Sequence, residues 1–115
     1  MLNVPRTVDN VLNDFFTALK KKDDGAIFKL FAQDGMLIDF EGTPHRTGAL
    51  RAFFRDWPPP SMQVRIEKQQ PGTQSAVVTL SLLGGAFSRV TQARATFTLN
   101  EKLLIFMLKF ELLPR

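Results

Sequence analysis

The sequence contains no cysteine, no tyrosine and a single histidine, His45. The absence of cysteine excludes disulfides, thiolate catalysis and zinc–thiolate sites. One histidine excludes a metal site built from several histidines and disfavours Ser-His-Asp catalysis, so no metal and no cofactor are predicted. Tyrosine hydroxyl chemistry is also excluded, although 11 phenylalanines supply ample aromatic volume.

Long apolar runs are absent as well. No stretch approaches the roughly 20 residues that cross a bilayer, and the first ten residues hold no hydrophobic signal core, so we expect a cytoplasmic protein without a membrane partner. The net charge is +4, but the only run of basic residues, 20–22, stands beside Asp23 and Asp24. Nucleic-acid binders usually gather their cations on one stripe. No nucleic-acid partner is therefore predicted.

The 115 residues suffice for one core, so residues 1–115 are predicted to form a single domain. Thr7 is a good N-cap, and the apolar stripe behind it, widened by Phe16, predicts a helix over about residues 7–22. A second, short helix is predicted between residues 23 and 34.

Residues 36–41 are predicted to form a strand, in which alternation alone points Asp39 to solvent. Thr47 is predicted to cap a third helix that stops before the prolines at 58–60.

From residue 61 onward the apolar period changes to two. Strands are predicted over residues 62–68 and 75–83, followed by a turn at 84–85, a third strand, a two-residue turn at 100–101 and a last strand. The inner face of this sheet is predicted to carry Ala76, Val78, Leu80, Leu82, Phe87, Thr91, Ala93, Ala95, Phe97, Leu104, Phe106, Leu108 and Phe110. The fold class is therefore α+β, with three N-terminal helices packed on a mainly antiparallel sheet.

The last strand, "KLLIFMLKFELL", is apolar on both faces, which is typical of a central strand. Its predicted outer residues, Leu103, Ile105 and Met107, would form an apolar patch with Val90. Monomers rarely expose such a patch. A homodimer through the outer sheet face is the expected partner arrangement, and scattered surface hydrophobes are the alternative.

This order of elements resembles the cone-shaped fold of the nuclear-transport-factor-2-like superfamily, which includes SnoaL-like cyclases and ketosteroid isomerases. The resemblance covers nearly the whole chain and is most specific in "FAQDGMLIDFEGTPHRTG", residues 31–48. It implies a curved sheet around a pocket and places Asp39 at the isomerase general-base position, facing that pocket.

The same resemblance puts the isomerase oxyanion donors at Phe15 and near Ala95. Neither side chain can donate a hydrogen bond, and removal of one such donor from an acyl-transfer enzyme costs about 10²–10³ in rate. Steroid-isomerase activity is therefore disfavoured. Asp39 remains the one candidate catalytic residue.

The leading hypothesis is a domain that binds a small, mostly apolar molecule in a pocket with one internal carboxylate. Two alternatives stay open: an isomerase- or cyclase-type enzyme with Asp39 as general base, and a protein-interaction or dimerisation module. The predicted pocket residues are Phe15, Leu19, Asp39, Phe53, Trp57, Ala95 and Phe106.

Overall fold

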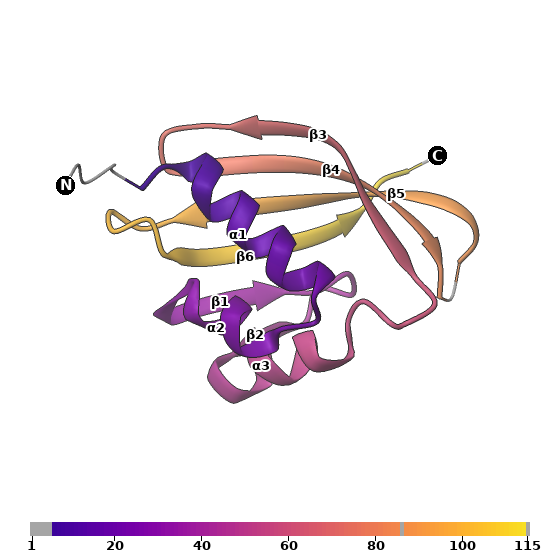
Figure 1. Ribbon diagram of the computed structural model, residues 1–115, viewed down its shortest axis with the longest axis horizontal. Helices are drawn as coiled ribbons and strands as arrows, with labels where there is room; N and C mark the ends of the chain where they lie inside the picture. Colours follow the sequence, from indigo (N-terminus) through magenta and orange to yellow (C-terminus); the bar gives the residue numbers. More distant parts are fainter. Residues whose placement is uncertain (1–5, 86, 115) are drawn as a thin grey trace.

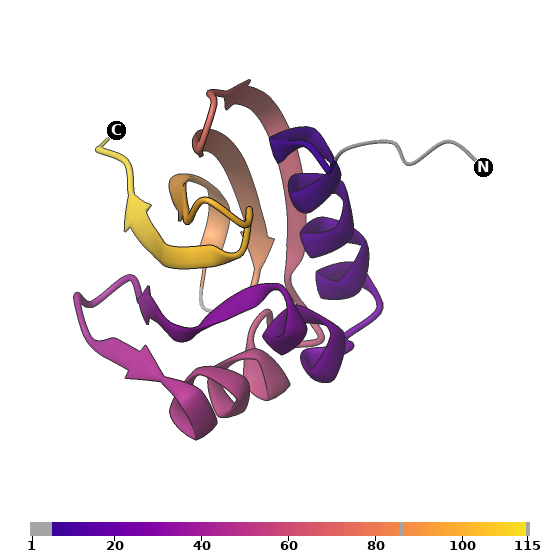
Figure 2. The ribbon, with the colours of Figure 1, turned by 90° about the vertical axis from the view of Figure 1, so that its left-hand side faces the viewer.

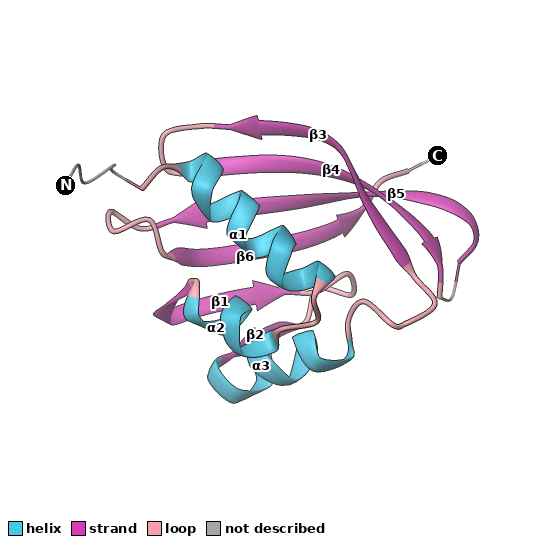
Figure 3. Ribbon diagram, viewed as in Figure 1, coloured by secondary structure: helices cyan, strands magenta, loops and turns pink. Residues whose placement is uncertain are grey.

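The structure, a computed structural model, describes residues 6–85 and 87–114, without the side chains of residues 87 and 88 (Figure 1). Three helices and a six-stranded sheet confirm the predicted α+β class (Figure 3). The elements are α1 (Val8–Lys20), α2 (Asp24–Lys29), β1 (Phe31–Ile38), β2 (Pro44–Arg46), α3 (Thr47–Asp56), β3 (Gln63–Pro71), β4 (Ser75–Gly84), β5 (Phe87–Leu99) and β6 (Ile105–Leu112).

The strands follow the order β2-β1-β6-β5-β4-β3, and every neighbouring pair is antiparallel except β1 with β6. The sheet is thus mainly antiparallel, and β6 lies in its interior, as its apolar sequence predicted. Figure 2 shows the sheet curving around one side of the molecule, with α1 across the concave side. β3 is an edge strand whose side chains are mostly exposed.

Helix α1 begins where the sequence predicts. The Thr7 hydroxyl accepts a hydrogen bond from the Asn10 backbone N–H at 3.3 Å, and the Asn10 side chain accepts one from the Thr7 backbone N–H at 3.0 Å. Two free amides at the helix start are thereby satisfied. The apolar stripe behind this cap packs into the core, where the Phe15 ring meets the Phe54 and Phe97 rings at centroid distances of 5.7 and 5.1 Å.

The second helix is shorter and the first strand longer than predicted. α2 ends at Lys29, and β1 already begins at Phe31 rather than at Met36. A side chain at Gly35 would place its Cβ 2.7 Å from the Ile105 carbonyl oxygen of β6. This close approach requires glycine, so Gly35 lies inside the strand instead of ending a helix.

The segment between β1 and α3 also differs from the prediction. Asp39 lies just beyond β1, in a turn, and residues 44–46 form the short strand β2, which the sequence pattern did not predict. Thr47 is the first residue of α3 rather than its cap. Arg46 occupies the cap position and makes no side-chain capping bond.

The inner face of β4 and β5 is confirmed. Alternate residues of β4 pair with alternate residues of β5, and all those described are buried. The Phe87 side chain, predicted on the same face, lies outside the described residues. The buried set comprises Ala76, Val78, Leu80, Leu82, Thr91, Ala93, Ala95 and Phe97.

The turn into β6 is longer than the predicted two residues. The Asn100 side chain accepts hydrogen bonds from the backbone N–H groups of Lys102 and Leu104 at 2.9 and 3.0 Å, which closes a wider loop. Leu99 then pairs with Ile105, Thr98 with Met107, and the residue between them bulges. This extra residue shifts the inward–outward alternation of the β6 side chains by one, so the residue before the bulge faces the side opposite to the predicted one. Ile105 is consequently fully buried, and Phe106, predicted to face inward, is 43% exposed.

Candidate functional site

Asp39, the candidate catalytic residue, is held within the turn that follows β1. Its Oδ1 accepts hydrogen bonds from the backbone N–H groups of Glu41 and Thr43 at 2.9 and 3.0 Å. Its Oδ2 lies 2.8 Å from Nε2 of His45, which stands on β2. The carboxylate therefore connects the end of β1 to the strand that pairs with it.

These contacts also set the protonation of Asp39. Partial burial raises the pKa of the carboxyl group, but hydrogen bonds from His45, Thr43 and Glu41 lower it more, so the pKa of Asp39 lies below its ordinary value. The side chains of Asp39 and His45 are 17% and 21% exposed. A carboxylate with a lowered pKa is a weak base near neutral pH. Its contacts make Asp39 foremost a support for the turn.

Aromatic rings fill the region beside this pair. The Phe53 ring lies 5.3 Å from the His45 ring and 6.0 Å from that of Trp57, and Phe110 stacks on Phe40 at 5.0 Å. Deeper in the cone, Phe15 and Ala95, the positions matched to isomerase donors, are fully buried. Side chains thus occupy much of the space in which an isomerase-like pocket was expected.

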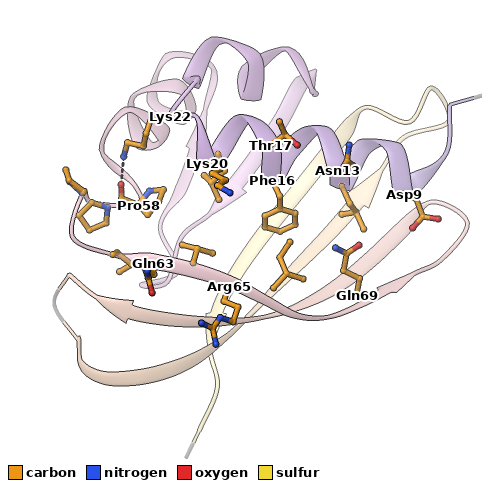
Figure 4. Close-up of a pocket in the computed structure, with 17 residues that line it drawn as sticks. Asp9, Asn13, Phe16, Thr17, Lys20, Lys22, Pro58, Gln63, Arg65 and Gln69 are labelled. Atoms are coloured by element: carbon orange, nitrogen blue, oxygen red, sulfur yellow. Dashed lines mark hydrogen bonds between the residues drawn. The ribbon is translucent and has the colours of Figure 1, made fainter.

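A large groove lies elsewhere, between α1 and β3, with a volume of about 910 Å³ (Figure 4). This volume is within the range of about 300–1,000 Å³ that is usual for small-molecule sites. Phe16, on the flank of α1, points across the groove toward β3. The apolar lining consists of Leu12, Phe16, Leu19, Pro58, Pro59, Pro60, Met62, Val64 and Ile66.

A bulge in β3 changes which side chain lines the groove beyond Ile66. Ile66 pairs with Leu80 and Lys68 with Thr79, which leaves Glu67 as an extra residue. Before the bulge the side chains that face α1 are even-numbered, as at Val64 and Ile66. Beyond it they are odd-numbered, so Gln69 lines the groove instead of Lys68. Its amide lies across from Asn13 of α1 (Figure 4). The groove therefore has an apolar middle, with the Asn13 and Gln69 amides toward the end at which Asp9 also lies (Figure 4).

The predicted pocket residues do not come together at this groove. Leu19 lines it. Phe15 and Ala95 are buried in the core, Phe106 is exposed at the β6 bulge, and the others lie around the turn and α3. The sequence signal for the groove was Phe16, which widens the apolar stripe of α1 and is only partly enclosed by the core.

Comparisons of the whole chain with known proteins give the fold. No family model matches, and no curated protein matches by sequence. A protein from Sphaerobacter thermophilus superimposes with a TM-score of 0.83 at 23% identity, over 95% of this chain and 98% of that one. An NTF2-like protein of unknown function from Mesorhizobium loti superimposes with a TM-score of 0.83 at 11% identity, over 99% and 97%. The chain has the nuclear-transport-factor-2-like fold.

An enzyme with this fold is also among the similar structures. This is SalBIII, an epoxide hydrolase/cyclase-like enzyme with a role in pyran ring formation in the polyether salinomycin. It superimposes with a TM-score of 0.77 at 15% identity, over 91% of this chain and 89% of its own. Structural similarity at identities this low shows the architecture alone, and the chemistry of this chain depends on its own residues.

Two further properties concern the described residues only. The described residues include no group of three or more His, Cys, Asp or Glu side chains close enough to hold a metal ion. None of their helices has the length and apolar character needed to span a membrane.

Proposed function

We propose that this NTF2-like chain binds a small, mostly apolar molecule in the groove between α1 and β3. The observation that carries the proposal is the groove itself, a space of about 910 Å³ whose middle is apolar and whose end holds the Asn13 and Gln69 amides. Apolar walls with a few polar groups are the usual composition of ligand sites, since burial supplies affinity and the polar groups fix orientation. The internal carboxylate expected from the sequence is not part of this site, because Asp39 serves the β1–β2 turn.

Filling the groove tests the proposal. Ile66, 37% exposed on the groove wall, can be replaced by tryptophan without enlarging the core. We expect Ile66→Trp to weaken the binding of decan-1-ol, measured by calorimetric titration, at least tenfold, because the indole occupies the ligand's space. The melting temperature should stay within about 3 °C of the wild type, since the substitution is at the surface.

A matched control is Leu112→Trp, which adds similar bulk at a residue that is 45% exposed at the end of β6 and outside the groove lining. It should bind decan-1-ol as the wild type does. Equal binding by wild type and Ile66→Trp would contradict a site in the groove.

A second candidate function, an isomerase- or cyclase-type reaction, is favoured by the contact of 2.8 Å between Asp39 and His45. In this alternative a carboxylate orients an imidazole, and the pair moves a proton beside the rings of Phe53 and Trp57. Asp39 itself is a poor general base because its oxygens already accept three hydrogen bonds. Imidazole would therefore be the proton acceptor in such a reaction.

We also propose a homodimer through the outer sheet face, on a smaller surface than the sequence suggested. Leu83 and Val90, 43% and 53% exposed, lie together at one end of this face. Met107, another predicted outer residue, pairs with Thr98 of β5. Thr98 is eight residues from Val90 along the same strand, which corresponds to about 27 Å. The apolar residues thus form two separate groups.

Light scattering tests this dimer. The wild type should have twice the 13.0 kDa mass of one chain. Val90→Lys should raise the dissociation constant of the dimer at least tenfold, because the substitution buries a charge in the interface. Gln33→Lys, at an exposed position of β1, should leave the mass unchanged. A wild type that is monomeric at high micromolar concentration would contradict the dimer.

A further inference from the structure

The two ends of the α1–β3 groove carry opposite charge, and Arg65 of β3 is the fourth charged residue that lines it. Asp9 lies at the N-terminal end of α1, and Lys20 and Lys22 lie at its C-terminal end (Figure 4). Asp9 and Lys20 are eleven residues apart, which corresponds to about 16 Å along a helix. The lysines are therefore far from the Asp9 carboxylate, and the apolar middle of the groove lies between them.

The acids next to the lysines in the sequence are engaged elsewhere. Asp23 accepts the Ala26 backbone N–H at 3.0 Å and so caps α2. Asp24 lies 2.7 Å from Nε of Arg51 and 3.6 Å from that of Arg55, and these arginines belong to α3. Among the described residues, no ion pair includes Lys20 or Lys22. Of the adjacent aspartates, Asp24 is paired with arginines of α3, and neither forms an ion pair with Lys20 or Lys22.

One of these lysines also contacts the loop on the other side of the groove. Nζ of Lys22 donates a hydrogen bond to the carbonyl oxygen of Pro58, which links the end of α1 to the loop before β3 (Figure 4). An ammonium group has three donors. Two of them remain for another acceptor at the groove mouth, where Pro58 and Pro59 form the apolar wall.

From this charge distribution we infer that the ligand of the groove is an amphiphilic anion. Its carboxylate, or another group of like charge, lies at the Lys20 and Lys22 end, and its apolar chain runs along Phe16 and Ile66. The inference rests on the proposed function, since it names the class of molecule that the same site takes. Exposed lysines attract an anion only modestly, so apolar contact supplies most of the affinity and the charge supplies the preference.

Neither the helix dipole nor strand addition accounts for the charged groove as well as an anionic ligand does. Lysines at a helix C-terminus interact favourably with the helix dipole, but this does not account for the apolar groove beside them. An extended peptide could pair with the free edge of β3. That edge, however, carries the Glu67 bulge, Lys68 and Pro71, which are devices that discourage strand addition.

The test compares three probes with the same chain length: decanoate, decan-1-ol and decylammonium. Wild type should bind decanoate about tenfold tighter than decan-1-ol, and decylammonium more weakly than either. The double variant Lys20→Gln/Lys22→Gln should lose the preference for decanoate and keep its affinity for decan-1-ol within twofold. The control Lys21→Gln/Lys29→Gln removes the same charge at positions that do not line the groove, and it should behave as the wild type does.

The salt dependence and the affinities of the three probes distinguish failure of the anion preference from failure of the groove site. Raising NaCl from 50 to 500 mM should weaken decanoate binding and leave decan-1-ol binding unchanged, because salt screens exposed charges. Equal affinity of the wild type for decanoate and decan-1-ol would overturn the anion preference and leave the proposed function standing. Binding of none of the probes would overturn both. An equal loss of decanoate affinity in the two double variants would overturn the assignment to Lys20 and Lys22.

Discussion

Replacing Phe15 with alanine should destabilise the protein by about 3–5 kcal/mol, the usual cost of removing a buried phenylalanine ring. The Phe15 side chain is fully buried, and its ring lies 5.1–5.7 Å from the rings of Phe16, Phe54 and Phe97. Loss of this ring leaves a cavity where α1 meets the sheet and the third helix. Thermal unfolding should show a fall in melting temperature of about 12–20 °C.

The matched control is Phe28→Ala on α2, where the ring is 36% exposed. Its melting temperature should fall by clearly less than that of Phe15→Ala, because Phe28 is partly exposed and lies outside the core cluster. Similar losses in the two variants would contradict a core centred on Phe15. Phe15→Tyr gives a second comparison. It adds a buried hydroxyl and should cost about 1–3 kcal/mol if that hydroxyl finds no partner.

Replacing Asp39 with alanine should cost about 1–3 kcal/mol at pH 7, because it removes hydrogen bonds to two backbone N–H groups and the contact with His45. Asp34→Ala, at an exposed position of β1, is the control and should have little effect. Denaturant unfolding monitored by circular dichroism gives both values. Hydrogen exchange should show the loss first in the β1–β2 hairpin.

The pH dependence provides an independent check on Asp39. Since the pKa of the folded carboxyl group is lowered, the group stabilises the protein above its unfolded pKa, and this stabilisation is lost as the pH falls through the folded value. The difference between wild type and Asp39→Asn should therefore be largest above about pH 5 and shrink toward pH 2. A difference that grows on acidification would contradict the lowered pKa.

The parts of the fold that were predicted correctly depend on local chemistry. Thr7 begins α1 because its hydroxyl caps a free amide, and no other part of the chain is needed for that bond. Alternation from Ala76 to Leu82 sorted the two faces of β4 because one face is buried along the whole strand.

The errors arose where one extra residue inverts that alternation. Phe106 of β6 is such an extra residue, and no glycine beside it reveals the bulge in the sequence. The wide loop at Asn100 depends on two bonds to its side chain, whereas a two-residue turn has the same polar composition. These features follow from strand pairing, which the sequence does not display.

The candidate site was harder to predict because it depends on the distance between elements. The pattern pointed Asp39 to solvent and the family resemblance pointed it into a pocket, but the structure uses it to hold a turn. A groove exists between α1 and β3 because the edge strand stands away from the helix. Phe16 and Gln69 line it through a helix flank and a bulge, and neither position is recognisable from residue type alone.

The central claim, that the α1–β3 groove is the binding site, is tested most directly by NMR. Backbone amide shifts of the wild type would be followed during titration with decanoate. The predicted result is that the largest shifts map to Leu12, Phe16, Val64 and Ile66, on the two walls of the groove. Largest shifts at Asp39, His45 and Phe53, beside the aromatic rings, with the groove residues unchanged, would contradict it.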